Sequence, residues 1–380
     1  MSTPGRSKGA DPLRPGDTGL LTIDLDAIAA NHAYLARTAA PAKCAGVIKA
    51  DAYGTGAAQA AARLFREGCD TFFVATLGEA AVVRAAVPGP VIYVLDGLFP
   101  GSADTFAGAR LRPVLSSLDQ IAEWNGFCAA NGPLPAAVHI DTGMNRLGLR
   151  PDEVDMLAGD ASRLASFELA LVMSHLACAD EPGNPMSERQ RKAFAELKGK
   201  LPPAPASLAN SAGTLLGKPY HFDLVRPGIA LYGGKAIEGQ PNPMRPVVRL
   251  QARIVQVRTA RAGETVGYGG AGKITRDSLL ATAAIGYADG LFRNLGSAPG
   301  KPGLVVHISG HPAPLLGRVS MDLITIDVTE LPEGTACAGG VVELLGEKTG
   351  VDNMGRAAGT IGYEVLTRLG HRYRRHYLNP

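Results

Sequence analysis

The feature that most constrains this chain is a regular alternation of short apolar runs with helical patterns between residues 44 and 225. Most of the apolar runs are apolar on both faces, which favours a buried parallel sheet over a half-exposed antiparallel one. Eight strands are predicted, at residues 44–48, 71–75, 91–95, 112–115, 136–141, 167–174, 206–209 and 222–225. Helical patterns between them include residues 57–67, 117–130 and 188–197. This succession predicts a (β/α)8 barrel, in which the chemistry lies on the loops after the strand C-termini.

A doubly wound parallel sheet is the alternative, because periodicity does not tell whether a sheet closes. The dinucleotide-binding pattern of such sheets, G-x-G-x-x-G after a strand, is incomplete here, since Gly54-Thr55-Gly56 lacks the third glycine. A further short strand is predicted at residues 20–25, followed by a helix with Asp26 as its N-cap.

The pattern changes near residue 245, where helical periodicity gives way to strands separated by Gly and Pro. Strands are predicted at residues 247–257, 279–284, 303–308, 313–319, 323–328 and 341–345. We therefore expect a disordered tail over residues 1–19, a barrel domain over 20–244 and a β-rich domain over 245–380. The tail is polar and rich in Pro and Gly, without the apolar segment of a signal peptide.

Charge and cysteine content bear on partners and compartment. Thirty-eight Lys and Arg against 35 Asp and Glu give a net charge of +3, which favours small ligands over nucleic acid. No apolar run of about 18 residues is available to span a membrane.

The five cysteines are odd in number and widely spread, so we expect neither a disulfide framework nor a metal site. A reducing, cytoplasmic location follows.

The first barrel strand leads into Lys49, which the barrel prediction places at the catalytic rim. A lysine that is desolvated after an apolar strand has a lowered pKa and can act as a nucleophile toward a carbonyl group. A solvated lysine at a strand end is the commoner case for a lone lysine. The surrounding sequence therefore decides the interpretation.

Residues 47–56, VIKADAYGTG, resemble the pyridoxal-phosphate lysine motif of the alanine racemase family. Five further matches follow in the family's order: residues 139–148 (HIDTGMNRLG), 174–180 (SHLACAD), 209–212 (ANSA), 225–233 (VRPGIALYG), and 286–290 (GYADG) with 317–322 (GRVSMD). The resemblance covers roughly residues 20–375 and implies a barrel that binds pyridoxal phosphate, a β-rich C-terminal domain that packs with the first strand, and a head-to-tail homodimer with shared active sites.

The resemblance implies the catalytic residues. Lys49 would hold pyridoxal phosphate as a Schiff base and act as one acid/base, and Tyr268 of a second copy would act as the other. Racemisation needs two such groups, because a proton leaves one face of a planar carbanion and returns to the opposite face. A tyrosine with an ordinary pKa of ~10 is a poor base, so a neighbour must lower that pKa. His175 and Arg226 are the implied neighbours, in a chain from Tyr268 through His175 to Arg226.

Arg226 has a second implied role beside the pyridine nitrogen of the cofactor. Many pyridoxal enzymes place a carboxylate there to keep the nitrogen protonated. An arginine, which is always cationic, disfavours that protonation and weakens the electron sink. We expect this to favour proton exchange over side reactions such as transamination.

The cofactor phosphate needs hydrogen-bond donors. Gly228 and Ile229 follow Pro227, so their backbone N–H groups can point at an anion where a helix begins. The resemblance adds three hydroxyl groups and one amide to the cofactor site: Ser211, Tyr53, Tyr363 and Asn210.

The implied substrate contacts come from both domains. Arg146 would approach the cofactor phenolate and the substrate carboxylate, and Met321 and Asp322 would come from the partner, with the Met321 N–H binding that carboxylate. Bulky tyrosines would exclude side chains larger than methyl: Tyr268, Tyr287 and Tyr363. A methyl group is worth only ~1–3 kcal/mol of discrimination, so serine would be excluded weakly.

The sequence departs from the family's pattern at three positions. His139 stands where many relatives have a lysine, carbamylated in some, whose negative charge orients Arg146. Thr55 replaces a usual histidine, and Ser320 replaces a frequent cysteine. The basic C-terminal segment, residues 368–376, is interpreted as solvated surface.

The expected function is therefore alanine racemisation, with L- and D-alanine as substrates and D-alanine supplied to peptidoglycan. A broader-specificity amino-acid racemase is one alternative. A pyridoxal-phosphate-dependent basic amino-acid decarboxylase is a second, although Ser320-Met-Asp lies where such enzymes carry a catalytic cysteine beside an aspartate. A non-catalytic pyridoxal-phosphate carrier is a third, and the additional C-terminal domain argues against it.

Overall fold

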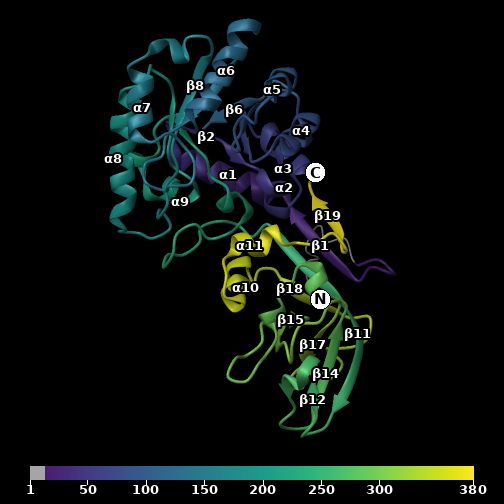
Figure 1. Ribbon diagram of the computed structural model, residues 1–380. Helices are drawn as coiled ribbons and strands as arrows, with labels where there is room; N and C mark the ends of the chain where they lie inside the picture. Colours follow the sequence, from purple (N-terminus) through teal and green to yellow (C-terminus); the bar gives the residue numbers. More distant parts are fainter. Residues whose placement is uncertain (1–12) are drawn as a thin grey trace, which may run out of the picture. The chain divides into compact units, whose positions relative to one another are not determined.

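The computed structural model describes residues 13–380, which form two compact units (Figure 1). Residues 28–231 and 235–244 form the barrel unit, and residues 13–27, 232–234 and 245–380 form the C-terminal unit. Residues 1–12 of the predicted tail lie outside the described residues. The domain boundaries expected from the sequence stay predictions.

The barrel unit contains a parallel sheet whose strands follow one another in chain order. Its seven strands are β3 (Gly46–Val47), β4 (Thr71–Val74), β5 (Val91–Val94), β6 (Arg112–Leu115), β7 (Pro135–His139), β8 (Glu168–Met173) and β9 (Ala206–Ser207). An eighth strand, β10 (Leu224–Val225), pairs in parallel with β2 (Lys43–Cys44), just before β3.

Backbone hydrogen bonds join the two edges of this sheet through β10. The Arg226 N–H donates to Ala209 O at 2.9 Å on one side, and the Val47 N–H donates to Pro227 O at 3.0 Å on the other. The sheet therefore closes, and the predicted (β/α)8 barrel is confirmed. The unbroken chain order also excludes the doubly wound alternative, in which strand order reverses at a switch point.

The helices of the barrel unit follow the strands, and Figure 1 shows several of them around the outside. They are α1 (Leu25–Ala39), which begins in the C-terminal unit, α2 (Lys49–Gly54), α3 (Ala57–Arg66), α4 (Leu77–Ala86), α5 (Ala103–Gly108), α6 (Leu118–Asn131), α7 (Pro151–Ala158), α8 (Pro185–Gly199) and α9 (Ser211–Leu216). Side-chain caps fix several starts: Thr76 Oγ1 accepts from Glu79 N, and Ser117 Oγ accepts from Gln120 N, both at 3.2 Å. Short 3₁₀ turns lie at Ala161–Leu164, Lys218–Tyr220 and Ile229–Tyr232.

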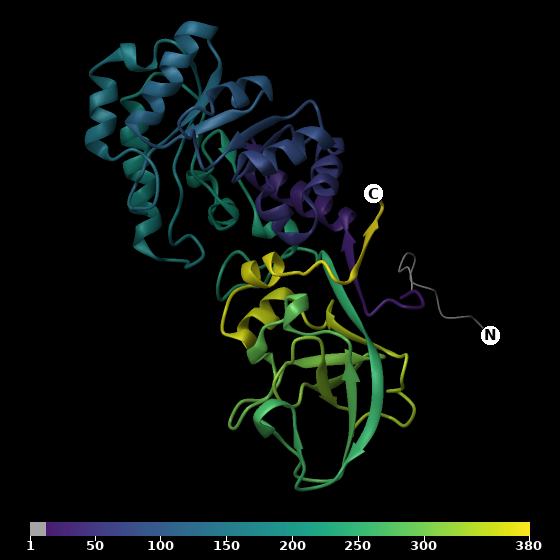
Figure 2. The same cartoon turned by 45° about the vertical axis from the view of Figure 1, so that its right-hand side comes forward.

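The C-terminal unit is mostly β, as predicted. Its main strands are β1 (Gly19–Asp24), β11 (Val248–Ala260), β14 (Ser278–Ala283), β15 (Val305–Ile308), β16 (His311–Pro314), β17 (Ile324–Asp327), β18 (Val341–Leu345) and β19 (Arg374–Leu378). Six of them lie in the order β16-β15-β18-β11-β1-β19, and β14 joins β17 to β11. Figure 2 shows β11 as a long bent strand.

Smaller elements complete this unit. They are the β12 (Thr265–Val266) and β13 (Gly272–Lys273) pair, helices α10 (Val351–Ala358) and α11 (Gly362–Thr367), and 3₁₀ turns at Tyr268–Gly270, Tyr287–Asp289 and Arg293–Leu295. The first strand of the chain, β1, pairs antiparallel with β11 and parallel with β19.

The strand predicted over residues 313–319 is wrong beyond Pro314, where β16 ends. Gly317 has a φ of +75°, and a Cβ there would lie 2.7 Å from Val266 O. The backbone therefore turns toward β12 instead of continuing along the sheet. Between residues 13 and 380, no helix is long and apolar enough to cross a membrane.

Candidate active site

The predicted site residues of the barrel unit all follow the C-terminal ends of barrel strands. Lys49 and Tyr53 follow β3, His139 ends β7, and Arg146 lies in the loop after it. His175 follows β8, and the β9 and β10 ends lead to the remaining residues: Asn210, Ser211, Arg226, Gly228 and Ile229. A barrel brings these ends to one face, where its enzymes carry their active sites.

A left-handed turn follows Lys49. Residues 50–53 all have φ between 52° and 55°, although none is glycine. A left-handed conformation costs roughly 1–2 kcal/mol per L-residue, so other interactions must hold this turn. The turn reverses the chain between Lys49 and the buried Tyr53, so that both residues lie at the same end of β3.

Glu79 is a side chain that bonds to the start of this turn, and the sequence analysis missed it. Its Oε1 accepts from the Ala50 N–H at 2.6 Å, and its Oε2 accepts from the Ala75 N–H at 2.7 Å. Glu79 also completes the capping box of α4 with Thr76. The T-x-x-E pattern directly after an apolar strand was the available signal, because it marks a helix start at the catalytic rim.

Burial lowers the pKa of Lys49, and the nearby positive charge of Arg146 lowers it further. Glu79 and Asp96 act in the opposite direction. A lysine with a lowered pKa has a larger fraction of neutral amine at neutral pH, which is the form that attacks a carbonyl group.

Arg226 is buried at the centre of the barrel mouth, 4% exposed. Its Nη1 donates to Ser207 Oγ, its Nη2 donates to Ser174 O at 2.6 Å, and its Nη2 lies 3.4 Å from His175 Nδ1. Burial lowers the pKa of Arg226 to about 9, so it stays cationic at neutral pH. The structure thus brings together two members of the implied Tyr268–His175–Arg226 chain, which both lie in the barrel unit.

Two histidines lie near this cation, His139 buried and His175 half-buried. Burial, followed by the charges of Arg226 and Arg146, holds the pKa of His175 well below its ordinary value. Burial and Arg226 lower the pKa of His139 to about 4. Ser116 Oγ lies 3.5 Å from His139 Nδ1. His139 is therefore neutral at neutral pH and provides no negative charge for Arg146.

Arg146 is exposed in a loop that Asp141 organises. The carboxylate of Asp141 accepts from the backbone N–H groups of Gly143 and Met144 at 2.9 Å and of Asn145 at 3.0 Å. Because His139 stands at the lysine position, the loop that carries Arg146 is fixed by the Asp141 carboxylate through these backbone N–H groups.

An anion cradle forms where β10 ends. Ser211 Oγ accepts from Gly228 N at 2.8 Å and lies 3.3 Å from Ala230 N. A Cβ at Gly228 would overlap the Tyr53 hydroxyl, so only glycine lets that hydroxyl approach the backbone. Asn210 caps α9 by accepting from Gly213 N at 2.9 Å and so orients Ser211. Hydroxyl and backbone N–H groups gathered in this way suit a phosphate.

The predicted residues of the C-terminal unit lie on exposed turns. Tyr268 is 68% exposed, Met321 is 52% exposed and Tyr287 is 38% exposed. The turns of Tyr287 and Met321 are joined backbone to backbone: Tyr287 N donates to Ser320 O, and Ala288 N donates to Met321 O, both at 3.0 Å. Tyr363 lies on α11 and is 37% exposed.

Arg372 is a second residue that the sequence analysis missed. It donates to Asp322 Oδ1 at 2.7 Å and pairs with the buried Asp289 at 3.2 Å. Asp289 in turn accepts from Gly286 N at 2.8 Å. Arg372, which is itself exposed, therefore fastens the Tyr287 turn to the Met321 turn. The interpretation of residues 368–376 as solvated surface is wrong at Leu369 and Tyr373, which are buried.

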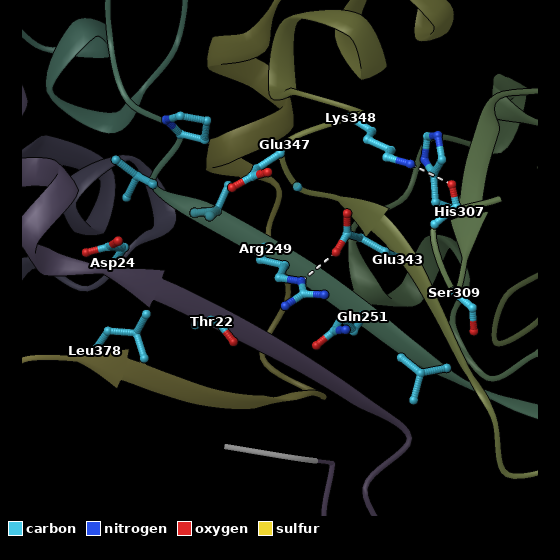
Figure 3. Close-up of a pocket in the computed structure, with 16 residues that line it drawn as sticks. Thr22, Asp24, Arg249, Gln251, His307, Ser309, Glu343, Glu347, Lys348 and Leu378 are labelled. Carbon is cyan, nitrogen blue, oxygen red and sulfur yellow. Dashed lines mark hydrogen bonds and ion pairs between the residues drawn. The ribbon is translucent and has the colours of Figure 1, made fainter. Parts of the chain in front are cut away.

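A hollow of about 730 Å³ lies on the sheet of the C-terminal unit (Figure 3). Its lining carries both signs of charge, with an ion pair between Arg249 and Glu343 and a bond from Lys348 Nζ to Gly310 O at 2.6 Å. None of the predicted site residues lines it. It is therefore separate from the candidate active site.

The cysteines take no part in the candidate site. All five are free, and burial raises the pKa of Cys69 to about 12. Among the residues that the structure describes, no group of three or more His, Cys, Asp or Glu side chains is arranged to hold a metal ion.

Comparison with known proteins matches both units. Residues 23–236 match the family model described as alanine racemase, N-terminal domain, and residues 247–377 match alanine racemase, C-terminal domain. The alanine racemase of Methylobacterium sp. (strain 4-46) is 51% identical over 360 residues, which cover 94% of this chain and 97% of the relative. That of Rhizobium meliloti is 47% identical over 364 residues, covering 94% and 96%.

The fold agrees with solved structures as well. The crystal structure of alanine racemase from Bartonella henselae with covalently bound pyridoxal phosphate matches with a TM-score of 0.90 and 38% identity, covering 95% of this chain and 99% of that one. Both family models together match far more than half of the chain. The chain therefore belongs to the alanine racemase family, a family of isomerases.

Proposed function

We propose that the chain is an alanine racemase that uses pyridoxal phosphate and interconverts L- and D-alanine by two-base proton transfer. The observation that carries the proposal is the barrel mouth, where Lys49, Arg146 and Arg226 surround histidines of lowered pKa. A site of this charge attracts anions, and both a cofactor phosphate and an amino-acid carboxylate are anions. The covalently bound pyridoxal phosphate of the Bartonella henselae relative supports the cofactor.

The residues present fit this cofactor. Lys49 would hold it covalently, and the hydroxyls of Tyr53, Ser211 and Tyr363 would hold its phosphate with the N–H groups of Gly228 and Ile229. Asn210 would position Ser211, Arg226 would lie at the pyridine nitrogen, and Arg146 would lie at the phenolate. When bound, pyridoxal phosphate withdraws electrons from the α-carbon of an amino acid and so acidifies its C–H bond.

The chain's own residues would then move the proton. From L-alanine, Tyr268 Oη takes the α-proton from one face and Lys49 Nζ returns a proton to the other face, which gives D-alanine. In each direction one proton leaves the α-carbon and one returns to it, so the total number of protons on enzyme and substrate is unchanged. The reverse reaction exchanges the roles of the two residues. His175, next to Arg226 at 3.4 Å, is neutral and can donate a ring N–H hydrogen bond that favours the phenolate form of Tyr268.

A head-to-tail homodimer is part of the proposal. Tyr268, Tyr287 and Met321 are large side chains held exposed on ordered turns, which supports a role in completing the barrel site of a second copy. The Met321 N–H and Asp322 would contact the substrate carboxylate, and the tyrosines would limit the substrate side chain to about a methyl group. The domains would be a barrel over 20–244 and a β-rich domain over 245–380.

The cellular role that we propose is supply of D-alanine for peptidoglycan in the cytoplasm. The five free cysteines support a reducing compartment, where thiols persist.

The deciding experiment incubates the purified chain with L-alanine and pyridoxal phosphate in heavy water. We expect D-alanine to accumulate with deuterium at the α-carbon in both enantiomers. Absence of both D-alanine and exchange would refute the proposal, and release of carbon dioxide would favour the decarboxylase. Equal turnover of L-alanine and of a larger substrate such as L-leucine would mean that the chain is a broad-specificity racemase and not an alanine racemase.

A further inference from the structure

Arg226 is a buried cation without a carboxylate partner among the residues that the structure describes. Its guanidinium donates to the hydroxyl of Ser207 and the carbonyl of Ser174 and lies near the His175 ring. Ser207 itself donates to Leu224 O at 2.5 Å, so its oxygen is oriented to accept from Arg226. A buried charge is costly unless polar groups or another source of negative potential surround it.

Such a source lies against the flat face of the guanidinium. Arg226 Cζ lies 5.7 Å from the centre of the Phe73 ring, within the range of a cation–π interaction. The Phe73 ring stacks on Tyr93, with centres 4.9 Å apart and planes 14° apart. At the far end, Arg112 Cζ lies 5.5 Å from the Tyr93 ring, and Arg112 Nη1 donates to Tyr93 Oη at 3.0 Å.

Strand register produces this column of four side chains. Phe73 pairs with Tyr93 across β4 and β5, and Tyr93 pairs with Arg112 across β5 and β6. Register partners in a sheet project to the same face, here toward the barrel interior. Val47 connects the column to Arg226, since it pairs with Phe73 and its N–H donates to Pro227 O.

We propose that Phe73 is a positioning residue for Arg226, whose charge it holds in place without neutralising it. A carboxylate would also hold a guanidinium, but it would cancel the positive charge that Arg226 presents to its surroundings. An aromatic face attracts the cation through its quadrupole and carries no net charge. This inference rests on the proposed function in one respect, which is that the charge of Arg226 acts on the cofactor's pyridine nitrogen.

Fluorinated phenylalanines test the proposal with little change of shape. Mono-, di- and trifluorinated phenylalanine would replace Phe73 in the full-length chain, since each fluorine weakens the negative potential of the ring face. Phe72 is the matched control, because it lies on the same strand, is equally buried, and has no cation over its ring among the described residues.

Two readouts separate the hold on Arg226 from its catalytic use. The first is the urea unfolding equilibrium of the chain without added cofactor, in the Arg226 and Arg226→Met backgrounds. We expect the folding equilibrium constant to fall step by step, by ~10-fold for the trifluorinated ring at position 73. The decrease should be absent in the Arg226→Met background.

The second readout is racemisation of alanine by the holoenzyme. We expect kcat to fall by ~10-fold across the same series while KM changes less than about twofold, because the substrate contacts lie elsewhere. Phe73→Tyr, which keeps an aromatic face, should retain more of kcat than Phe73→Leu.

The outcomes are distinct. Equal effects at positions 72 and 73, or a stability effect that persists in Arg226→Met, would show that Phe73 only fills the core. If Arg226→Met does not fold, the comparison of positions 72 and 73 still decides whether the ring of Phe73 stabilises Arg226. A stepwise loss of stability with unchanged kcat would overturn the claim that Phe73 supports the catalytic use of Arg226. An unmodified chain that forms no D-alanine refutes the proposed function and leaves the stability test standing.

Discussion

In the barrel unit most candidate residues are buried or half-buried after packed strands, with Arg146 exposed, whereas in the C-terminal unit they are more exposed. Arg226 is 4% exposed and Tyr268 is 68% exposed. The barrel residues change one another's pKa values through burial and proximity, as Arg226 does for His139 and His175. The pKa values of the barrel group are therefore set within the fold, whereas the exposed residues of the C-terminal unit lack comparable burial.

The two regions also use different means to hold their functional groups. Backbone N–H bonds to Glu79 hold the left-handed turn after Lys49, and carboxylate pairs with Arg372 hold the Met321 turn. Both devices reach the surface, but only the second joins opposite charges, which salt screens. The predictions below test whether this contrast has functional consequences.

The largest effect is expected for Lys49→Ala. Loss of the covalent attachment and of one acid/base should reduce racemisation by ~10⁴-fold or more. The visible absorbance of the lysine-bound cofactor should disappear. Lys43→Ala, at an exposed lysine that begins the same strand region, is the control and should retain both. Persistence of covalently bound cofactor in Lys49→Ala would move the attachment to another lysine.

Tyr268→Phe tests the exposed region. Conversion that starts from L-alanine should fall by ~10²–10⁴-fold, because the second acid/base is removed. The absorbance of the lysine-bound cofactor should remain, since Tyr268 does not attach it. Tyr34→Phe, at another exposed tyrosine, should be unchanged. Loss of the absorbance in Tyr268→Phe would mean that this residue has a structural role.

Glu79→Gln tests the turn after Lys49. A glutamine presents an NH₂ group to one of the two backbone N–H donors, so one of them loses its acceptor. Loss of a hydrogen bond to a charged group costs ~1.5–3 kcal/mol, and we expect kcat to fall by ~10- to 100-fold. Glu123→Gln, where a carboxylate accepts from Gly101 N on the surface, is the control. A kcat equal in both variants would show that the turn does not depend on Glu79.

Arg372→Gln tests the corresponding support in the C-terminal unit. Loss of the bonds to Asp322 and Asp289 should let the Met321 turn move and raise KM for alanine by ~10-fold, with a smaller effect on kcat. Arg276→Gln, which breaks a surface pair with Glu330, should leave KM unchanged. If high salt reproduces the effect in the unmodified enzyme, screening of these pairs is the cause.

A separate effect, on stability and not on activity, is a pH dependence from His139. Its folded pKa of about 4 lies below the ordinary 6.5, so the unfolded chain binds more protons between these values. The contribution is present above pH 6.5 and is lost as pH falls toward 4, by up to ~3 kcal/mol. Urea unfolding at several pH values gives the free energy of unfolding as a function of pH. Between pH 4 and 6.5 this free energy should change less with pH in His139→Gln than in the exposed control His311→Gln. Equal slopes would mean that another group titrates in this range.

Much of the barrel could be predicted, because strands buried on both faces leave continuous apolar runs. Strands β4, β5 and β6 lie within one residue of their predicted positions. The interruption between β2 and β3 at Ala45 and the turn at Gly317 could not be predicted. Both depend on which backbone lies alongside, and local composition does not record this.

The site was predictable to a different degree. The residues inside the six motifs could be named from the sequence, and their roles stay predictions. Glu79, Arg372 and Phe73 could not be assigned, because each acts on a residue far along the chain: Glu79 on Ala50, Arg372 on Asp322, and Phe73 on Arg226. Such pairings arise from strand register and loop packing, which periodicity does not specify.

The pairing of β1 with both β11 and β19 has a consequence for synthesis of the chain. The sheet of the C-terminal unit pairs β1 with a strand that lies about 350 residues later in the chain. At a translation rate of ~5–20 residues per second, β1 waits about 20–70 s for its last partner. The barrel strands between them are complete earlier. The β11 strand is made before β19, so β1 can pair on one side first, and its other edge stays unpaired until β19 emerges.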